Sequence, residues 1–227
     1  MGGTLRAGAA LRMMDAAACL SAERHCGSSA VTLSIDSTRF LSTASPGQLL
    51  QLRAILTRAF NTSMEVRVAV HAEDFTTGRR TLLAVGFFVF VSLAEGGGKR
   101  PVPRAIALTP SEMDNATLAA ERRALRLRQQ EELRRVEGDA ALDAAAEASE
   151  GSRHGMSDTE VVLTELVLPP HANHHSTLFG GQVCMWTEKA ALLSARRHAL
   201  AAQEGEGEAA AVFVMTAAVD TLAFRGP

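Results

Sequence analysis

The chain has 227 residues, of which 47% are apolar and 21% are charged, and its formal net charge is −2. This composition allows one or two domains with a sizeable core and excludes a disordered, collagen-like or disulfide-stapled protein. Because 25 acidic side chains balance 23 basic ones, a nucleic-acid partner is not expected. The longest apolar stretch, residues 82–94, is too short for a membrane span. Three cysteines without framework spacing favour a reducing compartment, so we expect the cytosol rather than mitochondria.

Apolar residues at helical spacing predict a buried helix over 8–25. The pattern then changes to β-branched and aromatic runs that are separated by turn residues, which predicts strands over 31–40, 48–60, 64–74 and 81–94. One long helix followed by a meander of strands favours a helix wrapped by an antiparallel sheet. The expected fold class is therefore α+β.

A glycine-rich stretch with nearby prolines begins a linker over 96–160, which contains a charged helix over about 110–136. We expect residues 1–95 to form a first unit that lacks its N-terminal strand. Residues 161–227 then form the N-terminal part of a second unit, which opens with a strand over 161–168.

An internal repeat supports this division into two units. The segment MDAAACLSAERH aligns with TEKAALLSARRH, which places Asp15 on Glu188. Further on, VTLSIDSTRF aligns with VMTAAVDTLAF at a larger offset, which places Asp36 on Asp220, so the second copy holds an insertion. We place this insertion in the Ala/Glu/Gly run at 201–211. The repeat is incomplete at both ends, which predicts one nearly complete unit and one truncated unit.

The stretch before the second helix carries the most informative pattern. A strand, a polar loop and the pair Gly180-Gly181 precede a helix over 182–198. Such a helix start presents backbone N–H groups that can stabilise an anion or a developing oxyanion. A Gly-Gly pair before a helix is also common as simple punctuation, so this signal is weak alone. Because most strands of the second unit are missing, we expect this helix to expose an apolar face.

Several motifs, in order along the chain, resemble the double hotdog acyl-coenzyme A thioesterases, and within them those that hydrolyse acetyl-coenzyme A. The motifs are ACLSAERH, RAFNTSMEV, LAAERR, ELVLPPHANHH with FGGQV, and the terminal FRGP. The resemblance implies a hotdog fold and hydrolysis of acyl-coenzyme A to the free acid and coenzyme A, without a cofactor. It also implies a homo-oligomer, ATP or ADP as possible regulators, and a truncated chain without the START lipid-binding domain of full-length relatives.

In such thioesterases the active site is shared between two hotdog units, and the resemblance assigns the catalytic pair here to Asp15 and Asn173. A carboxylate can orient and deprotonate the water that attacks a thioester carbonyl, and an amide side chain can hold that water or the substrate. The resemblance places the oxyanion-binding helix starts at Gly8 and at Gly180-Gly181. Without it, Asp15 would be interpreted as an ordinary helix residue and Asn173 as a turn residue.

The resemblance also implies three clusters that contact coenzyme A: Leu33, Ser34 and Ile35; Thr62, Ser63 and Met64; and Phe224, Arg225 and Gly226. Without it, they are strand, hairpin and chain-end residues. Three arginines of the charged helix can approach nucleotide phosphates or form a solvated face: Arg122, Arg123 and Arg126.

Other interpretations remain open at this stage. A catalytically inactive coenzyme A-binding or oligomerisation fragment is the main alternative, and a hotdog dehydratase is less favoured because Asp15 lacks the histidine that a His/Glu-type pair would need. The loop before residue 8 is mostly missing, so we expect Glu188 to be an ordinary helix residue and not a second centre. No metal site is expected, because His171, His174 and His175 lack a carboxylate or cysteine that would complete a zinc pattern.

Overall fold

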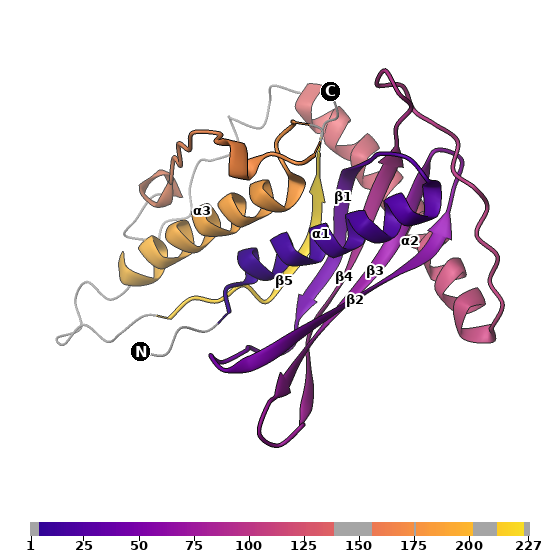
Figure 1. Ribbon diagram of the computed structural model, residues 1–227. Helices are drawn as coiled ribbons and strands as arrows, with labels where there is room; N and C mark the ends of the chain where they lie inside the picture. Colours follow the sequence, from indigo (N-terminus) through magenta and orange to yellow (C-terminus); the bar gives the residue numbers. More distant parts are fainter. Residues whose placement is uncertain (1–4, 139–155, 175, 202–212, 225–227) are drawn as a thin grey trace.

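The structure, a computed structural model, describes residues 5–138, 156–174, 176–201 and 213–224. A five-stranded antiparallel sheet with the order β2-β3-β4-β1-β5 curves around helix α1 (Figure 1). In chain order the main elements are α1 (Ala7–Cys26), β1 (Ala30–Phe40), β2 (Gln48–Ala59), β3 (Ser63–Asp74), β4 (Arg80–Ser92), α2 (Pro110–Gly138), α3 (Gly180–Ala201) and β5 (Ala218–Ala223). The expectation of a helix wrapped by an antiparallel sheet is thus confirmed.

The core lies between α1 and the concave face of the sheet. In β3 the side chains of Met64, Val66 and Val68 are fully buried on this face, as the period of two along a strand requires. They pack in one cluster with Met14 of α1 and Phe88 of β4. Each such side chain contributes about 1.5–3 kcal/mol when it is removed from water. This burial fixes the register of the strands and therefore the position of α1 above them.

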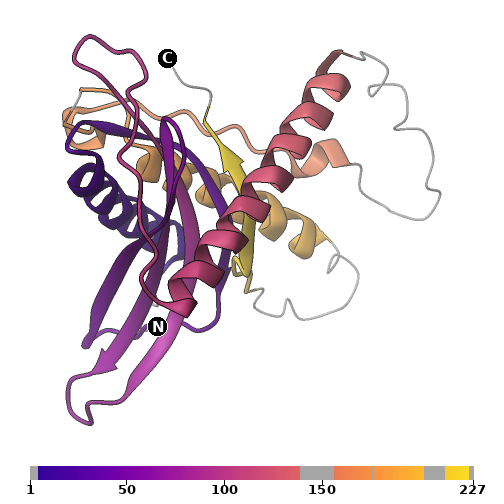
Figure 2. The same ribbon diagram turned by 90° about the vertical axis from the view of Figure 1, so that its right-hand side faces the viewer.

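Helix α2 covers the opposite face of the same sheet (Figure 2). Glu65 of β3 alternates with the core residues, so its side chain points away from α1 and is buried under α2. Arg122 Nη2 donates to Glu65 Oε1 at 2.7 Å, and the Thr57 hydroxyl donates to the same oxygen at 2.6 Å. The Arg122 guanidinium also stacks 3.7 Å from the ring centre of Phe87.

A second arginine of α2 reaches a carboxylate on β1. Arg126 Nη1 donates to Asp36 Oδ2 at 2.5 Å, and both side chains are buried. Burial raises the pKa of Asp36 despite the opposing charge of Arg126, so the pair does not fully compensate the loss of hydration. The expectation of a solvated arginine face is wrong for Arg122 and Arg126, because both are used to fasten α2 to the sheet.

Strand β5 joins the second unit to the first. It pairs with β1 in antiparallel register, with Asp36 opposite Thr221. The strand expected over 161–168 is absent from the described residues. That segment instead runs along α3, where Lys189 Nζ bonds Glu165 Oε1 at 2.9 Å and Arg197 donates to the Glu160 carbonyl.

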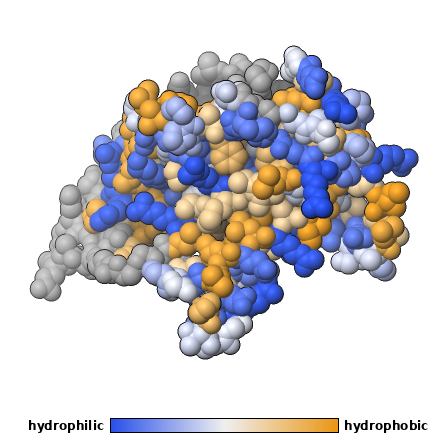
Figure 3. Space-filling view, viewed as in Figure 1, coloured by the Kyte–Doolittle hydropathy of each residue, from blue (hydrophilic) through white to orange (hydrophobic). Residues whose placement is uncertain are grey.

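Helix α3 is less exposed than expected, because one side of it packs against α1. Gln182, Cys184 and Glu188 are buried there, whereas Leu193 and Leu200 remain exposed. Apolar side chains lie among hydrophilic ones on the face that carries α1 (Figure 3). None of the helices within the described ranges is long and apolar enough to cross a membrane.

The contact between α2 and the sheet leads to a stability prediction. Arg126→Met leaves the Asp36 carboxylate buried without its partner, so the free energy of unfolding should fall by about 3–5 kcal/mol in denaturant titrations. The double variant Asp36→Asn, Arg126→Met should recover most of this loss. Arg128→Met on the exposed side of the same helix is the matched control and should change stability by about 0.5 kcal/mol or less. Equal losses in Arg126→Met and the control would contradict a stabilising role for the pair.

Candidate active site

Asp15 lies where α1 and α3 meet, and its side chain is completely buried. The Thr32 hydroxyl donates to Asp15 Oδ1 at 2.9 Å, and the backbone N–H of Gly181 donates to Asp15 Oδ2 at 2.7 Å. These partners come from β1 and from the first turn of α3. A carboxylate of the first unit is therefore held by the helix start of the second unit.

The surroundings of Asp15 tune its basicity. Burial raises the pKa of Asp15 from 3.8 to about 6, while the hydrogen bonds from Thr32 and Gly181 lower it in part. Both of these partners are uncharged donors, so neither supplies a positive charge that would hold the carboxylate in its ionised form. A carboxylate with a pKa near 6 can accept a proton at neutral pH and release it again, as a general base must.

The helices approach closely at glycines. A Cβ added to Gly181 would lie 2.8 Å from Arg12 Cα, and one added to Gly180 would lie 3.1 Å from Asp15 Oδ2. Real side chains do not tolerate the first distance, so only glycine permits this approach. The pair Gly180-Gly181 is therefore more than punctuation. The N–H of Gly181 already donates to Asp15 Oδ2, and this hydrogen bond competes with the predicted binding of an oxyanion by the same N–H.

A reciprocal arrangement surrounds Glu188, which the repeat aligns with Asp15. The side chain of Glu188 is 8% exposed, and the Thr216 hydroxyl donates to its Oε1 at 3.2 Å. A Cβ added to Gly8 would lie 3.0 Å from both Glu188 Oε2 and Met185 Cα. Glu188 is therefore buried and hydrogen-bonded, while the expectation that it forms no second centre stays a prediction. It lines a cavity of about 270 Å³ together with Thr216 and apolar side chains of α1, α3 and β5.

Asn173 lies in the loop that precedes α3, and its hydrogen bonds close that loop. Its Oδ1 accepts from the backbone N–H of Thr177 at 3.1 Å, and its backbone N–H donates to the Thr177 carbonyl at 2.8 Å. Ser176, within this turn, has a φ of 59°, a left-handed conformation that favours glycine. The hydrogen bonds of Asp15 go to Thr32 and Gly181, so the structure does not join the predicted pair directly.

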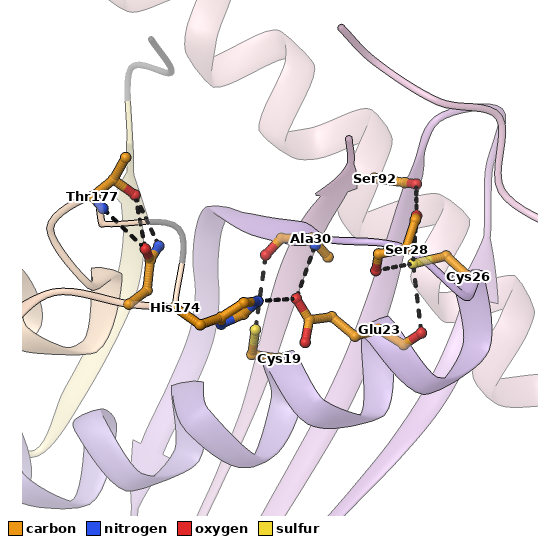
Figure 4. Close-up of polar contacts among 9 residues, drawn as sticks. Cys19, Glu23, Cys26, Ser28, Ala30, Ser92, His174 and Thr177 are labelled. Atoms are coloured by element: carbon orange, nitrogen blue, oxygen red, sulfur yellow. Dashed lines mark hydrogen bonds and ion pairs between the residues drawn. The ribbon is translucent and has the colours of Figure 1, made fainter. Parts of the chain in front are cut away.

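The Asn173 loop is attached to the first unit at two points. His174 Nε2 lies 2.9 Å from Glu23 Oε1 at the end of α1 (Figure 4). Arg12 Nη2 donates to the Pro170 carbonyl at 3.4 Å. The loop that carries Asn173 therefore lies along the same helix that carries Asp15.

The predicted coenzyme A clusters lie near the first half of β1. The backbone N–H of Phe224 donates to the Leu33 carbonyl at 2.8 Å, which joins two of the clusters. Ser34 pairs with Val89 and Met64 pairs with Phe90, so the cluster of Thr62, Ser63 and Met64 lies on the other side of β4. The side chains of Ile35 and Met64 belong to the core. The hairpin residues Thr62 and Ser63 are half-buried, whereas Arg225 and Gly226 fall outside the described residues.

Two residues that the sequence reasoning did not select contribute to the site. Thr32 holds Asp15, and Glu23 receives the His174 loop. The repeat contained a signal for the first, because its second alignment places Thr32 on Thr216, which holds Glu188 in the same way. No comparable signal marks Glu23, which lies in the helix as one of several charged residues.

Other chemistry is less well supported. Burial raises the pKa of the Cys19 and Cys184 thiols to about 12, so neither thiol is poised as a nucleophile. His171 packs edge-on against Trp186, with ring centres 5.1 Å apart. Within the ranges that the structure describes, no group of three or more His, Cys, Asp or Glu residues could hold a metal ion.

Comparisons with known proteins agree with this fold. The family model of the thioesterase superfamily matches residues 2–78. The acetyl-coenzyme A thioesterase of Mus musculus is 42% identical over 197 residues, which cover 86% of this chain and 35% of the relative. The chain thus spans about a third of the length of that curated relative.

Solved structures give the same assignment. A hexameric acyl-CoA thioesterase matches at a TM-score of 0.55 with 38% identity, over 56% of this chain and 82% of that chain. An acyl-CoA hydrolase from Staphylococcus aureus, an Asn-to-Ala variant in complex with coenzyme A, matches at 0.52 with 28% identity, over 64% and 84% of the chains. The chain therefore belongs to the thioesterase superfamily and carries its hotdog fold.

Proposed function

We propose that this chain hydrolyses the thioester bond of acyl-coenzyme A, with short acyl groups such as acetyl as substrates. The observation that carries the proposal is the buried Asp15 carboxylate, which has a pKa of about 6 and is held by neutral donors at the junction of two hotdog units. The similarity to an acetyl-coenzyme A thioesterase supports the short acyl group.

In the proposed reaction, Asp15 removes a proton from a water molecule while that water attacks the thioester carbonyl carbon. The carbonyl oxygen becomes an oxyanion, which backbone N–H groups at a helix start can stabilise. As the tetrahedral intermediate collapses, the carbon–sulfur bond breaks and the coenzyme A thiolate leaves with the electron pair. The proton held by Asp15 then passes to the thiolate, so the products are the free acid and coenzyme A.

Residue spacing in the S. aureus enzyme supports the assignment of the site. Solved variants of that enzyme replace an Asp, a Thr that follows it and an Asn that precedes it. The interval from the Asp to the Thr equals the interval from Asp15 to Thr32 in this chain. The interval from the Asn to the Asp equals the interval from Asn173 to Glu188, which is the repeat partner of Asp15. We infer that Asp15 and Thr32 come from one unit and Asn173 from the other, where it holds the attacking water or the substrate carbonyl.

Coenzyme A is proposed to bind near the first half of β1, through the three clusters that begin at Leu33, Thr62 and Phe224. Backbone groups at a strand end suit the amide-bearing pantetheine arm, and Arg225 suits a phosphate. Assembly into a homo-oligomer is supported by the hexameric state of a similar thioesterase. A cytosolic location and regulation by ATP or ADP stay predictions.

An inactive coenzyme A-binding fragment is the second candidate. One observation favours it: the Asn173 side chain is engaged by Thr177 within its own loop. Release of thiol from acetyl-coenzyme A, measured with a thiol reagent, separates the two candidates, because only an enzyme releases thiol at a rate that depends on Asp15.

Asp15→Asn should lower the rate of thiol release by about 10²- to 10⁴-fold, because the amide cannot accept the proton of the water. The variant should still bind coenzyme A in calorimetry. Asp114→Asn on the exposed face of α2 is the matched control and should keep the parent rate. Equal rates in the parent chain and Asp15→Asn would exclude the proposed mechanism.

The pH dependence of hydrolysis should report the Asp15 carboxyl. Only the ionised form accepts a proton, so kcat should level off above pH 6 and fall about tenfold for each pH unit below about 6. Rates measured between about pH 4.5 and 8 under saturating acetyl-coenzyme A test this expectation. A rate that stays nearly level down to pH 4.5, as the ordinary aspartate value of 3.8 would give, would show that Asp15 is not the base.

Thr32→Val should move this midpoint to higher pH, because the lost hydrogen bond is one that lowers the pKa of Asp15. A hydrogen bond to a charged group contributes about 1.5–3 kcal/mol, so the rate at pH 7 should fall roughly two- to fifteenfold. Thr32→Ser keeps the hydroxyl and is the matched control, with a midpoint close to that of the parent chain. A midpoint that does not move in Thr32→Val would show that this hydroxyl does not tune Asp15.

A further inference from the structure

The last part of α1 presents a carboxylate that is already fixed in place. Glu23 Oε1 accepts the backbone N–H of Ala30, the first residue of β1, at 3.1 Å. The helix ends soon after Glu23, where Gly27 takes a left-handed conformation and its N–H bonds the Glu23 carbonyl at 2.8 Å. Glu23 is thus held through both its side chain and its backbone, and the site for an incoming donor is preformed.

The donor to this carboxylate comes from the second unit. His174 Nε2 lies 2.9 Å from the same Oε1 atom of Glu23, and Figure 4 shows the imidazole reaching across to the end of α1. An imidazole N–H can make this bond in the neutral or the protonated form. Glu23 is mostly buried and His174 is more than half exposed, so the contact closes the outer edge of the junction.

His174 belongs to the same hydrogen-bonded turn as Asn173, so its contact with Glu23 bears on the position of Asn173. Residue 173 is bonded through its backbone and side chain to Thr177, and the N–H of Ser176 donates to the Asn173 carbonyl at 3.0 Å. These hydrogen bonds link Asn173 closely to Ser176 and Thr177. Because His174 directly follows Asn173, its contact with Glu23 determines how that turn sits over the first unit.

We propose that His174 is a positioning residue that holds the Asn173 turn against α1 through Glu23. The inference rests on the proposed function, because it gives His174 a role only through Asn173. Misplacement of a catalytic group by about 1 Å can cost about 10²-fold in rate, so a contact next to Asn173 matters for turnover.

A double-mutant cycle on hydrolysis tests whether His174 acts through Asn173. His174→Ala should lower kcat about tenfold in the parent chain, with a smaller change in KM, and should have little effect in the Asn173→Ala background. His174→Gln, which keeps a donor near the position of Nε2, should recover most of the rate. His198→Ala, an exposed histidine on α3, is the matched control. An equal loss in both backgrounds, or no loss in either, would overturn the proposal.

A second measurement tests the contact between His174 and Glu23 without relying on activity. Amide hydrogen exchange of peptides that contain residues 169–179 should become faster in His174→Ala and in Glu23→Ala, but not in the His198→Ala control. Unchanged exchange would overturn this contact, and faster exchange with an unchanged rate of hydrolysis would overturn its role in positioning. If Asp15→Asn leaves hydrolysis unchanged, the proposed function fails instead, whatever the exchange experiment shows.

Discussion

The close approach of α1 and α3 is the constraint on which the site depends. Gly181 lies against the backbone of Arg12, and Gly8 lies against the backbone of Met185, so the glycine near the start of each helix touches the other helix. This contact removes water from Asp15 and Glu188 and brings the N–H of Gly181 within 2.7 Å of Asp15. A side chain at Gly181 would force α3 away from the backbone of Arg12, and one at Gly8 would press against Met185 and Glu188.

Two aspartates near β1, Asp36 and Asp15, differ in their surroundings and therefore in the role that each carboxylate can take. Asp36 faces α2 and is paired with the permanently charged Arg126, so this carboxylate is committed to holding the helix. Burial raises the pKa of both aspartates, but Asp15 faces α3 and receives its hydrogen bonds from neutral donors, so no opposite charge engages its carboxylate, and its pKa is about 6. At pH 7, this shift corresponds to about 3 kcal/mol that the folded chain loses by keeping Asp15 ionised. The core on the α1 side of the sheet offsets that cost.

The sequence predicts most of the fold because hydrophobic period and turn residues act locally. The helix over 8–25 and the four strands of the first unit differ from the observed elements by only a few residues. The strand over 161–168 is wrong because a strand needs a partner, and periodicity cannot reveal whether one is present. The sequence also does not reveal that Arg122 and Arg126 of α2 form buried ion pairs, for a related reason. Their partners, Glu65 and Asp36, lie in strands far away in the sequence.

The site itself is predictable only in part, because its residues come from separate segments of the chain. The resemblance selects Asp15 and Asn173, but nothing in the sequence measures the distance between them or shows what holds the intervening loop. In the structure, the contacts that orient the Asn173 loop toward Asp15 cross from the second unit to α1, as His174 to Glu23 and Pro170 to Arg12 show. Without these contacts between the units, the geometry between the two groups would be lost. The proposed catalytic arrangement is thus a property of the junction, and changes at its edge should alter turnover before they alter the stability of either unit.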